Sequence, residues 1–391
     1  MSHTLIENIG CLVTNDPTFD GTPLGLVENA ALVIESGVIK WVGQTGEFSR
    51  SDVDNSVDAL GRCVIPGFVD SHTHLIFAGD RSAEFRARML GESYVTGGIN
   101  QTVELTRATS TDDLLINARR LFSEAMVSGT TTIECKSGYG LTVVDEVRSL
   151  SVARQLTEET TFLGAHVVPR EFVDSPDAYV DLICGEMLDS VLPYAKWIDV
   201  FCDRGAFNVE QARRILTTGM SKGLLPRLHA NQLESGGGVQ LGVELGVASV
   251  DHVSHLSNAD IAALSTSATV ATLLPGAEFS TRSNYPDARP LFEAGVTVAL
   301  ASDCNPGSSY TSNMPFIMAV AVRDMHFSPE QALWSSTKGG ALALRRTDVG
   351  HLGVSAKADF SILKTGSYIH LTYRPGVPLI DEVWRHGLRI H

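Results

Sequence analysis

The residues of this 391-residue chain best suited to chemistry are two histidines separated by one residue, His72 and His74. They follow an apolar run at 64–69 that has the character of a buried strand. Alternate side chains of a strand share a face, so both imidazoles would point the same way and could bind one metal ion. Two solvated histidines at a strand end are an equally good interpretation of an isolated pair. The choice between these two interpretations therefore depends on whether other metal-ligand residues are predicted to lie near the pair.

The elements that would position such a site form a regular series. Short apolar or β-branched runs alternate with helical stretches from about residue 64 to about residue 303. This alternation indicates a parallel sheet, and eight repeats indicate closure into a (β/α)8 barrel. The predicted strands are 63–74, 129–136, 161–167, 197–202, 225–230, 247–252, 269–274 and 296–303, and the predicted helices include 111–128, 143–158, 209–222, 239–245 and 287–294.

The two ends of the chain have a different pattern. Near the N-terminus, strand-like 30–34 and 38–42 flank a turn at 35–37 and predict a hairpin. Near the C-terminus, 358–363 and 380–384 are short strands among turns. We therefore predict an α/β protein with a metal-dependent barrel over 64–344 and a small composite β-domain, similar to a β-sandwich, from 1–63 and 345–391.

Metal-ligand residue types fall at the ends of several predicted barrel strands, where barrel enzymes carry their active sites. His72 and His74 end the first strand, His229 the fifth and Asp303 the eighth. Three imidazoles and one carboxylate, with no thiolate, suit Zn²⁺ and also Fe²⁺ or Mn²⁺. Such an ion lowers the pKa of bound water to about 7 and polarises a carbonyl, which favours hydrolysis of an amide-like bond. His252, at the end of the sixth strand, would then be a base near that water rather than a ligand.

Composition excludes several other classes of protein. A hydrophobic fraction of 43% and a charged fraction of 19% are typical of a folded chain with a sizeable core. The formal net charge of -15 disfavours nucleic acid and anionic membranes as partners. The six cysteines form no C-x-x-C pair, and neither a secretion signal nor a membrane-spanning run is visible. We expect a cytoplasmic protein that acts on a small molecule.

Several motifs resemble the amidohydrolase superfamily, whose members combine such a barrel with a composite β-domain. They are G-F-V-D-S-H-T-H at 67–74, a histidine ending each of strands five and six, and S-D-C-N at 302–305. Within that superfamily, six more motifs are similar to those of the imidazolonepropionases: F-A-G-D-R-S-A-E-F (77–85), G-E-S-Y (91–94), K-S-G-Y-G-L (136–141), F-L-G-A-H-V-V-P (162–169), D-V-F-C-D-R-G-A-F (199–207) and D-C-N-P-G-S-S (303–309).

This resemblance spans the whole chain and implies a reaction and a cofactor. The reaction is hydrolysis of 4-imidazolone-5-propanoate to N-formimidoyl-L-glutamate in histidine degradation. The cofactor is one divalent metal ion per subunit, zinc or iron, on His72, His74, His229 and Asp303. A homodimer is compatible with the resemblance, although no repeat or coiled-coil seam argues for it independently.

The resemblance also implies substrate contacts. A guanidinium suits bidentate binding of the substrate's propionate, and Arg81 matches the family's substrate arginine. An ion pair of Arg81 with Asp80 or Glu84 is the alternative, and Tyr94 is as well explained by packing as by contact. The other expected contacts with the substrate are Tyr94, Tyr139, His166, Gln232, Asn305, Gly307 and Ser308.

Gln232 departs from the family pattern. After the histidine of strand five many members read H-A-D-E, whereas this chain reads H-A-N-Q at 229–232. Gln232 can accept and donate hydrogen bonds to an imidazolone ring but cannot exchange a proton. His252, Asp303 or water would then transfer the proton. Gln232 would take part in catalysis only by a hydrogen bond to the substrate.

A second departure from the family pattern is Asp203, which stands where glutamate is expected and is a conservative change.

Lys136 bears on the number of metal ions. Lys136 could be read as a carboxylated lysine bridging two metals, as in hydantoinase-like relatives. Those relatives place it at the end of strand four, where this chain has Cys202 and Asp203. A single metal ion is therefore the preferred interpretation.

Two other functions remain open on the sequence. An aminohydrolase that deaminates a heterocyclic amine uses the same metal frame, but it usually needs a glutamate where this chain has Gln232. A catalytically silent barrel that binds a ligand is the third reading, although every metal-ligand type is present.

Overall fold

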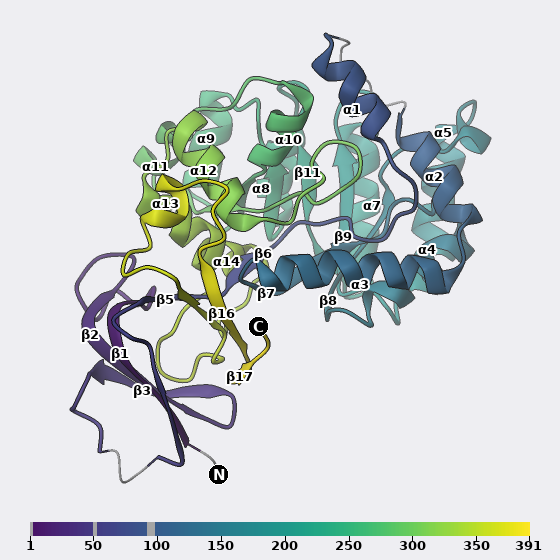
Figure 1. Cartoon of the computed structure of the whole chain (residues 1–391). Helices are drawn as coiled ribbons and strands as arrows, with labels where there is room; N and C mark the ends of the chain where they lie inside the picture. The colour runs from purple at the N-terminus through teal and green to yellow at the C-terminus, as the bar shows by residue number, and fades with distance from the viewer. Residues whose placement is uncertain (1–2, 50–52, 92–97) are drawn as a thin grey trace. The chain divides into compact units, whose positions relative to one another are not determined.

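The computed structural model describes residues 3–49, 53–91 and 98–391 (Figure 1). Two compact units divide the chain. The first comprises Met1–Ser71, Glu124–Thr132 and Asn313–His391, and the second comprises His72–Ser123 and Ile133–Ser312.

The first unit contains a mixed sheet built from both ends of the chain, as predicted. Its strands lie in the order β17-β16-β15-β5-β1-β2-β3, with β4 paired to β1. The predicted hairpin is confirmed, because β2 and β3 pair antiparallel with Glu35 opposite Val38. Buried side chains such as Ile6, Leu32 and Phe360 form its core. The strands are β1 (His3–Val13), β2 (Leu26–Glu35), β3 (Val38–Gln44), β4 (Asn55–Asp58), β5 (Cys63–Pro66), β15 (Phe360–Leu363), β16 (Ile380–Arg385) and β17 (Leu388–Arg389).

The second sheet is the predicted parallel barrel, with neighbours in the order β14-β13-β12-β11-β9-β8-β7-β6 and the short β10 beside β9. Its strands are buried along their whole length, with the exception of Leu225, as strands covered on both faces must be. They are β6 (Phe68–Asp70), β7 (Thr130–Lys136), β8 (Glu159–Ala165), β9 (Trp197–Cys202), β10 (Leu225–Pro226), β11 (Leu228–Ala230), β12 (Ser249–His252), β13 (Val270–Leu273) and β14 (Val298–Leu300).

One expectation about the strands is corrected. The predicted first strand, 63–74, is two strands, since β5 belongs to the first sheet and β6 to the barrel. Gly67 separates them at a place where a Cβ atom would lie 2.2 Å from Thr131 Oγ1. A glycine is therefore required at this crossing.

The two histidines lie just beyond β6, in an extended segment that closes the barrel. Thr73, between them, forms a parallel bridge with Cys304. The His74 N–H donates to Cys304 O, and the Asp303 N–H donates to His72 O, both at 3.0 Å. The segment after strand eight thus runs beside the histidine pair.

Helices cover the outer face of the barrel, and α4, α7 and α8 pack against β8, β9 and β11 (Figure 1). Within the described ranges, no helix is long and apolar enough to cross a lipid bilayer. Helices of the second unit are α1 (Ser82–Met89), α2 (Ile99–Ala108), α4 (Val143–Ala153), α5 (Pro176–Leu182), α6 (Leu188–Val191), α7 (Val209–Ser221), α8 (Gly238–Leu245), α9 (Asn258–Ser265), α10 (Pro275–Thr281) and α11 (Arg289–Glu293). The remaining helices are α3 (Thr111–Val127), α12 (Met314–Asp324), α13 (Pro329–Trp334), α14 (Gly340–Ala343) and α15 (His370–Tyr373).

Candidate metal centre and substrate cavity

Three of the expected ligands meet at the C-terminal end of the barrel. His72 Nε2 and His74 Nε2 lie 3.2 Å apart. Asp303 Oδ1 lies 3.6 Å from the first nitrogen and 3.5 Å from the second. The His229 ring is next to them, with its centroid 4.4 Å from that of His72. These four side chains are at most 3% exposed, so they could hold a divalent metal ion away from bulk water.

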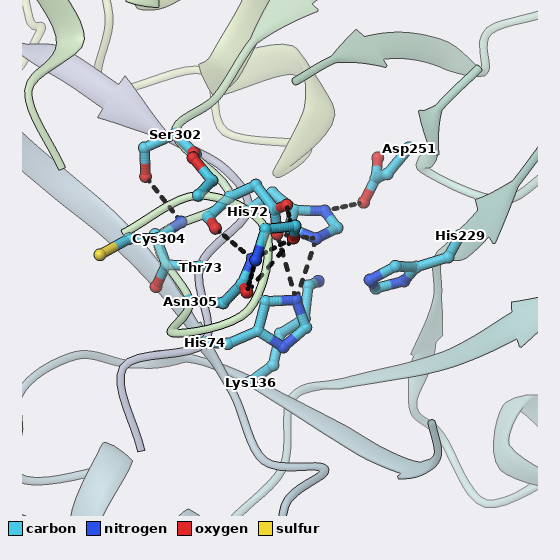
Figure 2. A network of polar contacts seen from close by, with 12 residues as sticks. His72, Thr73, His74, Lys136, His229, Asp251, Ser302, Cys304 and Asn305 are labelled. Atoms are coloured by element: carbon cyan, nitrogen blue, oxygen red, sulfur yellow. Dashed lines mark hydrogen bonds and ion pairs between the residues drawn. The ribbon is translucent and has the colours of Figure 1, made fainter. Parts of the chain in front are cut away.

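Carboxylates lie on the far side of two of these rings. His72 Nδ1 is hydrogen-bonded to Asp251 Oδ2 at 2.7 Å, and His229 Nδ1 lies 3.0 Å from Asp199 Oδ2 in an ion-pair contact. Figure 2 shows the ring of His72 between Asp251 and His74. A carboxylate only accepts, so Nδ1 of His72 carries the hydrogen and its Nε2 presents a lone pair. This carboxylate–histidine arrangement is the usual support of a metal ligand.

The protonation states of these groups suit a cation. Burial, followed by the charge of Lys136, holds the pKa of His72 well below its ordinary value. Burial and then the neighbouring His72 lower the pKa of His74 in the same way. Burial raises the pKa of Asp303 well above its usual range, although Asn305 and Ser308 donate hydrogen bonds to it. Neutral imidazoles beside a carboxylate that lacks a counter-charge are what a bound divalent ion requires.

Lys136 does not support the two-metal reading. Its Nζ lies 3.0 Å from Glu134 Oε1 and 2.9 Å from Asp199 Oδ2. Burial would lower the pKa of Lys136, but the two carboxylates raise it above the ordinary value. The side chain is therefore a charged ammonium, and a carbamate there would face two carboxylates.

His252 ends β12 beside the ligand group. Its ring centroid lies 5.6 Å from that of His72 and 5.3 Å from that of His229. Burial holds the pKa of His252 well below the ordinary value, so the ring is a neutral base. His252 has a positive φ of 75° and Val253 one of 46°. Non-glycine residues in this region are strained, as is common next to functional groups.

A pocket with about 470 Å³ of empty space, part of it open to solvent, lies beside these residues. Its mostly polar lining suits a small polar substrate. The expected substrate residues converge on it, except Tyr94, which lies outside the described residues. Its lining consists of His74, Arg81, Ile99, Tyr139, His166, Val167, Phe201, His229, Gln232, His252, Asp303, Asn305, Gly307 and Ser308.

Arg81 both lines the cavity and forms an ion pair. Glu84 Oε2 accepts from its Nε and Glu84 Oε1 from its Nη2, each at 2.8 Å. A Cβ atom on Gly307 would lie 2.3 Å from Arg81 Nη1, and one on Gly98 would lie 2.3 Å from Nη2. Two glycines thus make room for the guanidinium, and Glu84 leaves its Nη1 end available.

The turn after Asp303 is held together by the Asn305 side chain. Its Oδ1 accepts from the backbone N–H groups of Gly307 and Ser308, both at 2.8 Å. The Ser308 hydroxyl lies 3.2 Å from Asp303 Oδ2. The turn therefore shapes the cavity wall and orients Asp303, while Oδ1 of Asp303 faces the histidines.

His166 and Tyr139 face the cavity from the neighbouring loops that follow β8 and β7. His166 Nδ1 lies 3.0 Å from Gly138 O. Because a carbonyl only accepts, Nδ1 carries the hydrogen and Nε2 is left as an acceptor. Burial lowers the pKa of His166 to about 3. The ring is neutral at pH 7 and presents an acceptor to a ligand N–H.

This titration predicts a pH-dependent stability difference. Between pH 3 and 6.5 the unfolded chain protonates His166 and the folded chain does not, so acid favours unfolding by about 1.4 kcal/mol per pH unit. Metal-free His166→Gln should lack this contribution. Its unfolding free energy relative to wild type should rise by about 2 kcal/mol from pH 6.5 to 5. Urea unfolding at both values measures this, and a constant difference would contradict the neutral folded form.

The loop that carries Tyr139 is organised by a buried carboxylate. Glu146 Oε1 accepts from the N–H groups of Gly138, Gly140 and Leu141 at 3.3, 2.9 and 2.8 Å. Gly138 has a φ of 107°, which a side chain would oppose. These hydrogen bonds hold the loop in the conformation that brings Tyr139 to the cavity.

We expect Glu146→Ala to damage substrate binding through this loop. Three buried donors lose their acceptor, at a cost in stability of about 1–3 kcal/mol for each donor that stays unsatisfied. The KM should rise about tenfold, while kcat changes less, since no reacting group is removed. Steady-state kinetics beside the exposed control Glu158→Gln would measure this. A stability loss with an unchanged KM would show that the loop does not position substrate.

Sequence reasoning missed the carboxylates that orient the ligands. Asp199 lay unassigned inside the D-V-F-C-D motif, and Asp251 directly precedes His252. Charged residues inside buried strands were the available signal, because such residues are rarely buried without a partner.

The sequence matches a family described as the amidohydrolase family over residues 63–387. The chain therefore belongs to the amidohydrolase family. It is also 60% identical over 387 residues, 99% of this chain and 97% of the relative, to an imidazolonepropionase from Mycolicibacterium smegmatis. It is 61% identical over 390 residues, 99% of each chain, to an imidazolonepropionase from Salinispora arenicola. Within the family, the chain thus groups with the imidazolonepropionases and is a hydrolase.

The fold has solved counterparts as well. One is a zinc-bound adenosine deaminase from Xanthomonas campestris, with a TM-score of 0.73, 19% identity and coverage of 99% of this chain and 92% of that one. At this identity the likeness establishes the fold alone. The predicted barrel with its composite β-domain and the predicted family are both confirmed.

Proposed function

We propose that this chain hydrolyses 4-imidazolone-5-propanoate to N-formimidoyl-L-glutamate, with one divalent metal ion at His72, His74, His229 and Asp303. The observation that carries the proposal is the convergence of three ligand atoms within 3.2 to 3.6 Å on a cavity that Arg81 also lines. The substrate has both features that this cavity suits, a ring amide to be opened and a carboxylate to be bound.

The donor set suits zinc or iron, since it combines imidazole nitrogen with carboxylate oxygen and contains no thiolate. When bound, the ion supplies Lewis acidity that acidifies water and polarises the ring carbonyl. Asp251 and Asp199 keep the Nε2 lone pairs of His72 and His229 directed at the ion.

Proton transfer falls to His252 and Asp303. His252 is a neutral imidazole next to the ligands, so it can accept the proton of the attacking water. Asp303 keeps one oxygen toward the histidines and the other toward Ser308. It can take up a proton that the water releases and pass that proton to the ring nitrogen as the C–N bond breaks. Gln232 lines the cavity and contacts the ring without exchanging a proton.

Binding residues surround the remaining parts of the substrate. Arg81 is the partner for the propionate, with its Nη1 end toward the cavity. The Nε2 acceptor of His166 suits a ring N–H, and Tyr139 closes the same side, with its ring centroid 5.3 Å from that of His166. Asn305, Gly307 and Ser308 form the opposite wall.

An aminohydrolase is less well supported. Among the described residues that line the cavity there is no glutamate, and Asp303 is the one carboxylate. The position at which an aminohydrolase usually has a proton-carrying glutamate is Gln232 here. A silent binding barrel is disfavoured because the ligands and His252 are all in place.

The direct test is incubation of the purified protein with freshly made 4-imidazolone-5-propanoate. We expect loss of the ring's ultraviolet absorbance and appearance of N-formimidoyl-L-glutamate without release of ammonia. Ammonia from heterocyclic amines, with the imidazolone untouched, would indicate the aminohydrolase. Binding without turnover would indicate the silent barrel.

The cytoplasmic location and the homodimer stay predictions of the sequence. A cell fractionation and a light-scattering mass of the purified protein would test them.

A further inference from the structure

Five charged side chains lie buried beneath the ligand atoms of the barrel. They comprise three carboxylates and two cations, so their charges leave one negative charge in excess. Each is at most 1% exposed. They are Glu134 and Lys136 on β7, Asp199 on β9, Arg227 just before β11, and Asp251 on β12.

Lys136 is the member that joins two separate parts of the ligand set. Its Nζ lies 3.0 Å from Glu134 Oε1 and 2.9 Å from Asp199 Oδ2. Figure 2 shows the side chain of Lys136 running toward the group formed by His72, His74 and His229. One ammonium therefore fixes the orientation of two carboxylates that belong to different strands.

Each of these carboxylates holds a different ligand. Glu134 Oε2 accepts from the N–H of Thr73, the residue between His72 and His74, at 3.0 Å. Asp199 contacts His229 twice: its Oδ1 accepts a hydrogen bond from the His229 backbone N–H at 3.2 Å, and its Oδ2 lies 3.0 Å from ring Nδ1 in an ion-pair contact. Displacing either carboxylate would move one part of the ligand set relative to the other.

The charges give Lys136 a second effect. With Asp303 ionised, the buried groups carry two negative charges in excess, which a divalent cation neutralises. Without the ammonium, Glu134 and Asp199 would repel each other in a site of low dielectric, and both would have to move or bind a proton. The added negative charge would attract a cation more strongly. The ligand side chains would, however, lose their relative positions, and metal affinity depends on the groups that orient the ligands.

We propose that Lys136 is a positioning residue that sets the metal affinity of the site, because it fixes His229 through Asp199 and the His72–His74 segment through Glu134. The proposal rests on the proposed function only in that a divalent ion binds these ligands. It adds a residue that touches neither ion nor substrate.

The test is the affinity of the substrate-free protein for zinc, measured by competition with a chromophoric chelator. Lys136→Met should bind zinc about 10–100-fold more weakly than wild type. Lys136→Arg, which retains the cation, should bind more tightly than Lys136→Met. The matched control is Lys196→Met, since Lys196 Nζ also pairs with a buried carboxylate, Glu159, at 2.8 Å, at the start of β8. It should lose stability and keep the affinity of wild type.

Zinc affinities of Lys136→Met within threefold of the Lys196→Met control would overturn the proposal and leave Lys136 a role in stability alone. If Lys136→Met does not fold, Lys136→Gln takes its place, because its amide can still donate to one carboxylate. The zinc affinity of Lys136→Gln is then compared with that of Lys196→Met by the same threefold criterion. Since no substrate is present, the outcome does not depend on which reaction the protein catalyses.

Discussion

His252→Gln should lower kcat by about 10²–10⁴-fold while the protein keeps its metal ion. The glutamine keeps polarity and approximate size but cannot accept a proton. His252 lies beside the ligands without being needed for the group of His72, His74 and Asp303. Loss of His252 should therefore lower kcat and leave the metal content unchanged. Initial rates together with metal content of the purified variant would measure both quantities.

A nearby histidine supplies the control. His255 is exposed and lies three residues further on, so His255→Gln should leave kcat unchanged. Two results would remove His252 from its role as base. One is unaltered turnover of His252→Gln, and the other is loss of metal in proportion to loss of activity, which would make His252 a ligand. The latter is a real alternative, because His252 also groups with His72 and His229 within metal-binding distance.

Arg81→Met should lower kcat/KM by about 10²-fold or more, mostly through KM. Removing one member of a buried, charge-assisted pair costs about 2–5 kcal/mol, and Arg81 is 7% exposed in the cavity wall. Methionine fills similar space without the charge, so Glu84 loses its partner and the propionate loses its anchor. Arg86→Met, on the exposed side of α1, is the matched control.

A substrate analogue separates binding of the propionate from general damage. An imidazolone bearing the propionate as its methyl ester has no charge for Arg81 to bind. The Arg81→Met variant should therefore process this ester at a rate close to that of wild type. Equal losses on the acid and the ester would mean that Arg81 supports the fold of the cavity wall through Glu84 and does not bind the propionate.

The fold was largely predictable because its pattern is local and repeated. Eight buried runs alternate with amphipathic helices, which indicates a parallel sheet covered on both faces, and eight repeats suit its closure into a barrel. The prediction of one first strand over 63–74 was wrong, since β5 and β6 belong to different sheets. The crossing at Gly67 depends on the approach of Thr131, which is distant in sequence and leaves no periodic signal.

The candidate site was predictable where chemistry dictates residue type. His72, His74, His229 and Asp303 stood at strand ends, and the structure brings them together. The supporting charges were not predictable. Lys136 could be taken for a metal-bridging lysine, although its position on the second strand argued against this role. Only the positions of Glu134 and Asp199 identify it as an ammonium between two carboxylates. Similarly, Asn305 seemed free to contact a ligand, but its amide is used within its own turn.

The most direct test of the account is a metal titration of the stripped protein during turnover of 4-imidazolone-5-propanoate. Chelator-treated protein should be inactive, and N-formimidoyl-L-glutamate formation should return in proportion to added zinc or iron, with a break at one ion per chain. Full turnover of metal-free protein would contradict the account, because His252 and Asp303 would then suffice. A break at two ions would contradict the single-metal site and the assignment of Lys136 as an ammonium.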